Sequence, residues 1–518
     1  MSFVTQGKTK RLLAVHGWAG TLLGLMLYVV IFTGAVVVFE KEIDTWARGS
    51  LVPEAGIGTQ VDHHFRVAAR EVDRTFYENV SIARDPSGAL RYLFRGHEEG
   101  PEGEADVVVR LLVDAETGDV LERWEGPAGE LPQDTASALR DFWIDLHVQL
   151  YLPNPYGLIL VGVLGLMMMF AAVSGILIHG HLLRDLFVSA RGRARLLGAR
   201  DLHILAGSWG LPFAVILAFT GAFFGFATSV GLPAMSMLAF GGDRAAIEDT
   251  LFVDEGVVDL APAPTAALDF VVHDAMTRSR AQVSSIAISN YDSAGAKLLV
   301  SMTQSPGSLV TQVLAFDGVT RRFEGVRPLI GQEPSWGSTL LDLIIPLHFG
   351  NFAGLASKTV WFGMGLAMAF VTATGMLLWT KRRETQPLWR GFRRWITVTV
   401  WGVPCAMLIS AVAYFLTLPA GDPYFWTPRA FFAACVVILG SGVMRQEVEV
   451  VLRRATALLC VLLPLLRLLT GGASWSEALL AGVPIIIVLD VLLIATGAVL
   501  LRREKPRSVH GSLREPAE

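Results

Sequence analysis

The chain has 518 residues, of which 52% are hydrophobic and only 17% are charged. These proportions exclude an ordinary soluble protein of this length, because about a quarter of the residues in such proteins are charged. The formal net charge of −4 gives no reason to expect a nucleic-acid partner. The three cysteines lie in apolar stretches without a Cys-x-x-Cys motif, which excludes a disulfide scaffold, an iron–sulfur cluster and a covalently attached haem.

Apolar stretches of about 20 residues are long enough to cross a bilayer. The sequence predicts eight such spans, at approximately residues 12–39, 156–179, 203–227, 355–379, 396–418, 428–444, 455–470 and 479–501. We therefore expect an α-helical polytopic membrane protein. Its first span has no cleavage site before Glu40 and is expected to be a retained anchor.

Lysine and arginine cluster in five segments beside these spans: GKTKR, RDLFVSARGRARLLGARD, KRRETQPLWRGFRRW, RQEVEVVLRR and RREKPR. Such residues are enriched in the cytoplasmic segments of membrane proteins. With eight spans all five segments lie on one side, so both termini are expected in the cytoplasm. The long segments 41–145 and 228–345 then lie on the opposite side of the membrane.

Landmark residues occur twice along the chain. His16 precedes Thr33 by 17 residues, and His203 precedes Thr220 by the same 17. In both stretches the histidine opens the apolar run and a Thr-Gly pair lies near its far end. Repeated spacing of this kind indicates an internal duplication.

The similarity extends beyond these stretches. Segment 146–180 resembles segment 347–380, since each has Leu-His, a glycine-interrupted approach and a span ending in Ser-Gly or Thr-Gly. The sequence therefore predicts a duplicated unit of helix, external module and helix over about 8–180 and 195–380. Residues 396–501 lack these landmarks and are expected to form an added four-helix block.

Each external segment begins with a helical pattern and continues with alternating stretches typical of strands. The helices are expected at 63–76 and 266–278, and the strand-like stretches at 80–85, 90–96, 106–124, 282–289, 296–302 and 311–325. Within them VDAETGDVLE predicts a hairpin, and the charged RGHEEGPEGEAD predicts an exposed loop. We expect two small α+β modules, each with one helix on an antiparallel sheet.

Five histidines lie at the ends of predicted spans. His16 and His203 are at the cytoplasmic ends of the first and third spans, and His179 is at the cytoplasmic end of the second. His147 and His348 are at the external ends of the second and fourth. A duplicated unit places equivalent residues opposite each other, so His16 with His203, and His147 with His348, have the arrangement of two axial imidazoles on a haem iron. His179 in place of one cytoplasmic partner is the main alternative.

Gly20 and Gly207 follow His16 and His203 by four residues, one turn along the same helix face. Glycine there leaves room for a flat macrocycle, although close helix packing is an alternative explanation. A single histidine at a membrane face can also anchor a helix end. Zinc fits less well, because it takes four clustered ligands and neither layer offers an obvious carboxylate or cysteine.

The remaining polar residues have simpler interpretations. Asp490 lies in the middle of a span, where a charge is costly, and is expected either to handle protons or to make a packing contact. Arg467 is close enough to a span end to extend outward to water. Met167–Met169 are expected in the core, and solvated positions are expected for His63, His64, His97, His273 and His510.

The stretches KRLLAVHGWAGTLLGLMLYVVIFTG, DLHILAGSWGLPFAVILAFTG and LHFGNFAGLASKTVWFGMGLAMAFVTATGMLLW resemble the PepSY-associated transmembrane proteins, over about residues 8–385. The external modules resemble PepSY domains. The family includes iron-regulated inner-membrane proteins and ferric-siderophore reductases. The resemblance implies two non-covalent haem b groups in a bacterial inner membrane, with His16, His147, His179, His203 and His348 as the axial ligands.

This comparison suggests the following organisation. A first transmembrane helix occupies 1–40, PepSY-like periplasmic modules occupy 41–145 and 228–345, spans two and three occupy 146–227, span four occupies 346–385, the added block occupies 386–505 and a cytoplasmic tail occupies 506–518. The added block lies outside the family's usual four-span core.

The function expected from these features is the transfer of electrons across the membrane to periplasmic ferric chelates. Reduction releases the iron because hard oxygen ligands suit Fe(III) better than Fe(II). No nicotinamide- or flavin-binding motif is present, so a membrane quinol or a separate cytoplasmic reductase is the expected donor. The alternatives are a metal or small-molecule transporter, which Asp490 would serve, and a sensor or scaffold without redox activity.

Overall fold

The computed structural model describes nine parts of the chain: residues 6–52, 56–58, 60–100, 103–178, 195–243, 259–303, 308–328, 335–444 and 447–502. These residues form two compact units. The first contains residues 1–40, 50–134 and 143–379, and the second contains residues 41–49, 135–142 and 380–518.

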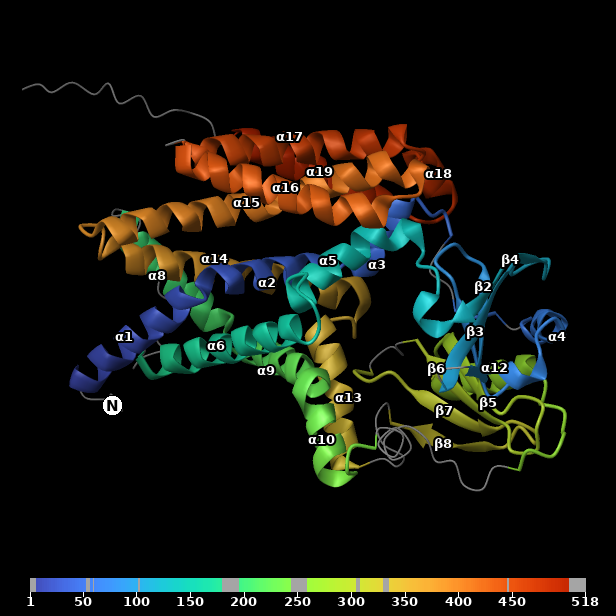
Figure 1. The fold of residues 1–518 in the computed structure, drawn as a ribbon. Helices are drawn as coiled ribbons and strands as arrows, with labels where there is room; N and C mark the ends of the chain where they lie inside the picture. The colour runs from blue at the N-terminus through green and yellow to red at the C-terminus, as the bar shows by residue number, and fades with distance from the viewer. Residues whose placement is uncertain are drawn as a thin grey trace, which may run out of the picture. The chain divides into compact units, whose positions relative to one another are not determined.

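Helices predominate in the first unit (Figure 1). They are α1 (Gln6–Leu22), α2 (Gly24–Val37), α4 (Asp62–Ala69), α6 (Tyr156–Ile178), α8 (Arg195–Trp209), α9 (Leu211–Phe226), α10 (Leu232–Ala239), α12 (Leu268–Ser279), α13 (Trp336–Phe349) and α14 (Gly354–Lys381). Two more helices, α3 (Glu40–Arg48) and α5 (Ala138–Gln149), contain residues of both units.

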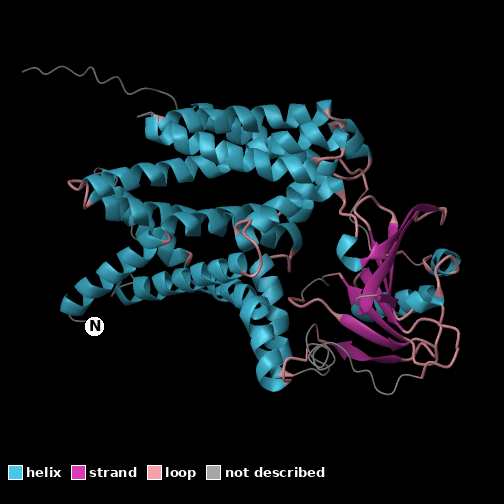
Figure 2. Ribbon diagram, in the orientation of Figure 1, coloured by secondary structure: helices cyan, strands magenta, loops and turns pink. Residues whose placement is uncertain are grey.

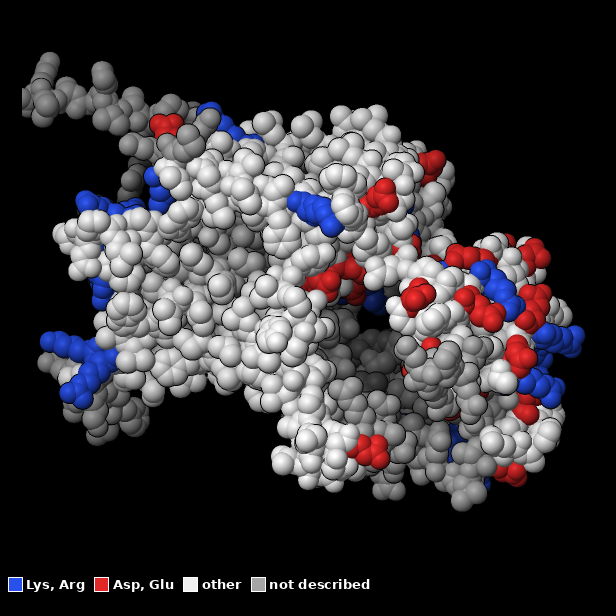
Figure 3. Space-filling model, in the orientation of Figure 1, with Lys and Arg blue, Asp and Glu red and all other residues white. Residues whose placement is uncertain are grey.

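The chain is a multi-pass membrane protein. Six helical stretches among the described residues are long and apolar enough to span a bilayer: Tyr156–Ile178, Leu211–Ala239, Gly354–Lys381, Pro387–Ala420, Pro423–Val443 and Ile485–Arg502. A seventh would be the pair Lys10–Leu22 and Gly24–Val37, which bends by 66° at Leu23. On the face shown in Figure 3, charged groups gather over the strands and at helix ends, while the sides of the long helices carry few.

The predicted third span has a different boundary in the structure. His203 lies on α8, and the long apolar stretch begins after it at Leu211, next to Pro212. Proline is well accommodated in the first turn of a helix, which explains why α9 starts there. Helix α6 packs against α9. Gly162 on α6 and Gly225 on α9 allow the two helix backbones to approach closely.

The strands of both external segments form a single antiparallel sheet in the order β4-β3-β2-β1-β5-β6-β7-β8 (Figure 2). Their bounds are β1 (Asn79–Arg84), β2 (Leu90–Gly100), β3 (Gly103–Val113), β4 (Val120–Pro127), β5 (Val283–Ser289), β6 (Lys297–Met302), β7 (Val313–Asp317) and β8 (Phe323–Arg327). We expected two separate sheets, but β1 pairs with β5, with Ile82 opposite Ile286. The prediction of an exposed loop at RGHEEGPEGEAD is also wrong, because β2 and β3 extend into this segment.

The helices α4 and α12 cap each other across this junction. The Asp269 carboxylate accepts hydrogen bonds from the backbone N–H groups of Val61 (2.7 Å) and Asp62 (2.9 Å). In return, the Asp62 carboxylate accepts one from the N–H of Leu268 at 2.8 Å. Carboxylates stabilise the positive end of a helix dipole, so each half of the sheet domain supplies a cap that the other half needs.

The turns of two hairpins also have the same design. Asp114 accepts hydrogen bonds from the N–H groups of Glu116 (2.9 Å) and Thr117 (2.8 Å), and this confirms the hairpin predicted at VDAETGDVLE. These bonds hold the pKa of Asp114 below its ordinary value. Asp317 makes the corresponding bond to the N–H of Thr320 at 2.7 Å.

The second unit is a helical block that includes α15 (Pro387–Thr417), α16 (Pro423–Met444), α17 (Val448–Leu469), α18 (Trp475–Leu480) and α19 (Ile485–Arg502). The long helix α15 packs against α16 and α17, and α17 packs against α19. Three arginines lie on α17, which is not among the six apolar stretches described above.

A buried ion pair joins α17 to α19. Arg467 and Asp490 are both fully buried, and their side chains meet at 2.8 Å. The indole N–H groups of Trp46 and Trp475 each donate to the same carboxylate at 2.8 Å. The expectation that Arg467 extends outward to water is therefore wrong, because the partner charge on α19 holds it inside the block.

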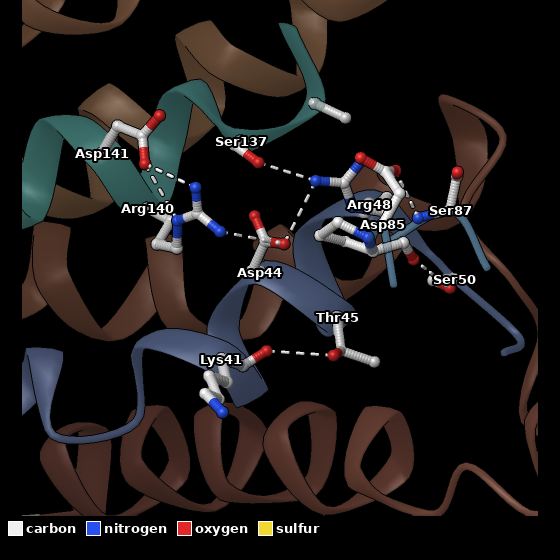
Figure 4. A network of polar contacts seen from close by, with 12 residues as sticks. Lys41, Asp44, Thr45, Arg48, Ser50, Asp85, Ser87, Ser137, Arg140 and Asp141 are labelled. Carbon is white, nitrogen blue, oxygen red and sulfur yellow. Dashed lines mark hydrogen bonds and ion pairs between the residues drawn. The ribbon is translucent and has the colours of Figure 1, made fainter. Parts of the chain in front are cut away.

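A second polar network in this unit joins α3 to the segment 135–142 (Figure 4). The guanidinium of Arg48 lies 3.1 Å from the Asp44 carboxylate and donates to the Ser137 hydroxyl at 2.6 Å. Arg140 lies 3.5 Å from Asp44 and 2.8 Å from Asp141. Asp141 therefore belongs to a structural ion-pair network.

Candidate functional site

The structure brings His147 and His348 together. His147 lies near the end of α5 and His348 near the end of α13, and their ring centres are 6.2 Å apart with the ring planes 26° from parallel. The Phe224 ring lies edge-on to His348, with ring centres 5.2 Å apart. We call His147 and His348 the outer pair.

His16 and His203 form the corresponding inner pair. They lie on α1 and α8, at matching positions of the two repeated stretches. A Cβ added to Gly20 would meet no atom within 4 Å, and one added to Gly207 would meet only Val371, at 3.9 Å. Both glycines therefore border open space, and their assignment to a site for a flat ligand stays a prediction.

Each of the four histidines is held through its Nδ1 atom by another helix. The partners are the Ser174 hydroxyl for His16 (2.8 Å), the Val30 carbonyl for His147 (2.9 Å), the Val371 carbonyl and Thr374 hydroxyl for His203 (3.0 and 3.1 Å), and the Thr220 hydroxyl for His348 (2.8 Å). Within the described parts of the chain, no hydrogen-bond partner contacts Nε2 of these histidines.

A Ser-Gly or Thr-Gly pair lies at every one of these contacts. A Cβ on the glycine would lie 2.6 Å from Cε1 of the facing imidazole at Gly34, 3.0 Å at Gly375, 3.4 Å at Gly221 and 3.7 Å at Gly175. The glycine therefore makes room for the imidazole on the partner helix, most critically at Gly34. We noted these pairs in the sequence as landmarks of the repeat but assigned them no role.

The contacts are reciprocal within each helix pair. The His16 ring on α1 lies against Gly175 on α6, while the His147 ring just before α6 lies against Gly34 on α2. The other half of the chain has the same exchange: His203 on α8 lies against α14, and His348 on α13 lies against Gly221 on α9. The four imidazoles thus all lie against a glycine or its neighbours on a partner helix, although the atoms that bond to Nδ1 differ.

The hydrogen bonds define which ring nitrogen is available. A carbonyl can only accept, so Nδ1 of His147 and His203 must carry the proton and Nε2 the lone pair. The two histidines of the outer pair lie outside the six apolar spans, and burial lowers the pKa of both, that of His348 to about 3. Neutral imidazoles with a free Nε2 are the form that binds metal ions.

The separation of the two ring centres in the outer pair equals the separation that a shared metal ion would require. An imidazole nitrogen lies about 2 Å from a bound metal ion, so two rings on opposite sides of one ion have centres ~6 Å apart. The observed separation is 6.2 Å. The donor set, two neutral imidazoles whose Nδ1 atoms are held by hydrogen bonds, would suit a haem iron.

The remaining histidines fall into two groups, those outside the described residues and those of the sheet domain. His179 and His510 lie outside the described residues, so the alternative inner ligand remains a prediction. His63 and His273 are exposed as expected, His97 is 44% exposed beside Asp106, and His64 is partly buried against Gly118.

The sheet domain contains a pocket of about 590 Å³, which was not predicted from the sequence. It lies where the two halves of the domain meet, and its lining includes Arg66, Arg70, Arg74, Tyr77 and Tyr291. The three arginines are spaced four residues apart in the sequence, but only Arg66 lies on α4, because the helix ends at Ala69 and Arg74 lies in a separate helical turn.

The chain has relatives among known proteins. The model of the family described as "PepSY-associated TM region" matches residues 13–382. A protein of Pseudomonas aeruginosa described as "Uncharacterized protein PA4219" is 26% identical over 270 residues. That match covers 48% of the chain and 64% of the relative, so the chain spans less than two thirds of the relative's length.

Proposed function

Because the chain belongs to the family of the PepSY-associated TM region, we propose that it is a haem-containing oxidoreductase of the bacterial inner membrane. It passes electrons across the bilayer and reduces periplasmic ferric chelates such as ferric siderophores. The observation that carries this proposal is the outer pair, whose two neutral imidazoles face each other at 6.2 Å between ring centres. Haem b, when bound, supplies the one-electron carrier.

The residues of the chain have distinct tasks in this proposal. His147 and His348 bind the outer haem, and His16 and His203 bind the inner one, with His179 as the alternative. Gly20 leaves the space that a macrocycle requires, and Gly207 does the same in the second half. Because each Nδ1 is held by a neighbouring helix, the imidazoles are oriented before the cofactor arrives.

The proposal includes the arrangement in the membrane. Eight spans, built from a duplicated helix–module–helix unit and an added four-helix block, place both termini and the basic segments in the cytoplasm. The sheet domain then lies in the periplasm, where ferric chelates are met. Electrons come from a membrane quinol or from a separate cytoplasmic reductase.

Asp490 was the sequence feature that kept the transporter alternative open. This carboxylate is paired with Arg467 and receives two indole N–H donors. A fully partnered buried carboxylate is suited to holding helices together. A sensor or scaffold leaves the four oriented imidazoles without a task.

The test is the visible spectrum of the purified full-length chain, produced in cells supplied with a haem precursor. We expect a Soret band that shifts on reduction with dithionite, and two haem b per chain. H147A and H348A should each remove about one haem, whereas H273A, at an exposed histidine of the sheet domain, should retain both. After anaerobic reduction, the protein should be reoxidised by ferric citrate.

Three outcomes would contradict the proposal. A colourless protein that binds divalent metal ions would favour the transporter. Unchanged haem content in both H147A and H348A would show that the outer pair is not a ligand pair. Failure of ferric chelates to reoxidise the reduced protein would remove the proposed acceptor.

A further inference from the structure

The four histidines differ in the atom that forms a hydrogen bond with Nδ1. Nδ1 of His147 bonds to the backbone carbonyl of Val30, whereas Nδ1 of His348 bonds to the side-chain hydroxyl of Thr220. The two members of the outer pair are therefore held differently, one by the main chain and one by a replaceable side chain. Among the described residues, the Thr220 hydroxyl is the hydrogen-bond partner of His348.

The direction of the Thr220–His348 bond follows from the other contacts of the hydroxyl. Thr220 donates its proton to the carbonyl of Ile216 at 2.8 Å, within its own helix. With its proton used in this way the oxygen acts as an acceptor, and this arrangement has Nδ1 of His348 as the donor. A hydroxyl that already donates is a stronger acceptor, because linked hydrogen bonds polarise one another.

Thr33 provides an internal comparison. It occupies the corresponding place on α2, is fully buried, and also donates within its helix, to the carbonyl of Val29 at 2.8 Å. Yet the facing histidine, His147, bonds to Val30 and not to the Thr33 hydroxyl. Thr33 and Thr220 thus share residue type, burial and back-bonding, and differ in their contact with an imidazole.

We propose that Thr220 is a positioning residue that fixes the ring orientation, the Nδ1–H tautomer and the donor strength of His348. The inference rests on the proposed function, since it concerns the iron that His348 would bind. Hydrogen bonds to the outer nitrogen of a ligating imidazole raise its basicity, and their loss commonly weakens binding about 10–100-fold. Thr220 therefore sets the affinity and the reduction potential of the outer haem separately from those of the inner one.

The test compares T220V, T220S and T33V in the full-length chain, with haem content and a redox titration as readouts. In T220V we expect haem binding at the outer site to weaken about 10-fold or more. We also expect the midpoint potential of that component, identified as the one that H348A removes, to become more positive, because a weaker donor stabilises Fe(III) less. T220S should restore both properties, and T33V should resemble the wild type.

A readout without haem separates this inference from the proposed function. The nitrogen-15 chemical shifts of histidine-labelled apoprotein report which ring nitrogen of His348 is protonated and hydrogen-bonded. T220V should lose the signal of a hydrogen-bonded Nδ1–H, and T33V should keep it. This measurement decides the inference even if the wild-type chain carries no haem and the proposed function fails.

The inference is overturned if T220V leaves the potential of the outer component and the nitrogen-15 shifts of His348 unchanged. It is also overturned if T33V has the same effect as T220V, because a general loss of packing would then explain both. Haem loss in T220V that T220S does not restore would likewise show that the hydroxyl is not the operative group.

Discussion

Gly34 is the position where a single methyl group would most disturb the outer pair. A Cβ there would lie 2.6 Å from Cε1 and 2.9 Å from Nδ1 of His147, well inside the contact distance of about 3.5–4.0 Å between non-bonded carbon atoms. The ring must then move away from the Val30 carbonyl. We expect G34A to lose most of the outer haem and to keep the inner one, as measured by haem per chain.

Gly175 offers the matched control. Its added Cβ would lie 3.7 Å from Cε1 of His16, which is an ordinary van der Waals contact. G175A should therefore retain two haems per chain. Equal losses in G34A and G175A, or no loss in G34A, would show that the glycines do not make room for the imidazoles.

For individual residues, the sequence was informative about the candidate histidines but did not indicate which residues hold their rings. Histidine at span ends, repeated with the same spacing, was sufficient to single out His16, His147, His203 and His348. The partner of each ring lies on another helix, 117 residues away for His147 and 171 for His203 with Thr374. Helical periodicity assigns a residue to a face of its own helix, but it does not say which helix that face meets.

The helices of the second unit depend on the buried pair Arg467–Asp490. Removing one member leaves the other charge buried without its partner, which lowers the free energy of unfolding by about 3–5 kcal/mol. We expect R467M and D490L each to lower the thermal midpoint in detergent, and the double variant R467M/D490L to be more stable than either single variant. Thermal unfolding followed by circular dichroism measures this.

The surface pair Arg278–Asp274 serves as the control, since its side chains are 45% and 26% exposed. Replacing either member should change the stability by less than about 1 kcal/mol. If the double variant R467M/D490L is as unstable as the worse single variant, the pair has a role beyond charge compensation.

The error about Arg467 has a clear physical cause. Position along the chain placed this residue near the end of a span, where long side chains reach water. What holds Arg467 inside lies on neighbouring helices: its guanidinium bonds to Asp490 on α19, and the Trp475 indole on α18 bonds to the same carboxylate.

The extension of β2 and β3 into RGHEEGPEGEAD was not predicted, because strand pairing outweighs the low strand propensity of Gly and Glu.

The two ends of the spans should face different compartments. Ser87 lies in the exposed turn before β2, and Gln386 lies in the exposed basic turn between α14 and α15. In intact spheroplasts, we expect S87C to react with a membrane-impermeant maleimide and Q386C to react only after permeabilisation. The native cysteines lie in the helices, and the wild-type chain measures their background labelling.

Labelling of both positions in intact spheroplasts would contradict the proposed topology, and so would labelling of Q386C alone. The prediction does not depend on haem, so it tests the arrangement in the membrane independently of the redox proposal.

The order of strands and helices within each external segment was predicted from the sequence. The joining of the two segments into one sheet was not. Each segment by itself reads as a complete small module, because alternation defines a strand and its faces without defining its neighbour. The pairing of β1 with β5 joins residues more than 200 positions apart, as Val80 and Ile288 show. Reciprocal capping by Asp62 and Asp269 is equally invisible before the fold is known.

The shared sheet has a consequence for the ancestry of the chain. If β5 were absent, β1 would present a row of unpaired N–H and C=O groups, and such an open edge recruits another strand. The near two-fold order of the sheet means that a second copy of the first half could occupy the place of the second half. If the two halves arose by the proposed duplication, a half-length forerunner could have formed the same sheet as a homodimer, and fusion would have allowed the two halves to diverge, as the different Nδ1 partners Val30 and Thr220 illustrate.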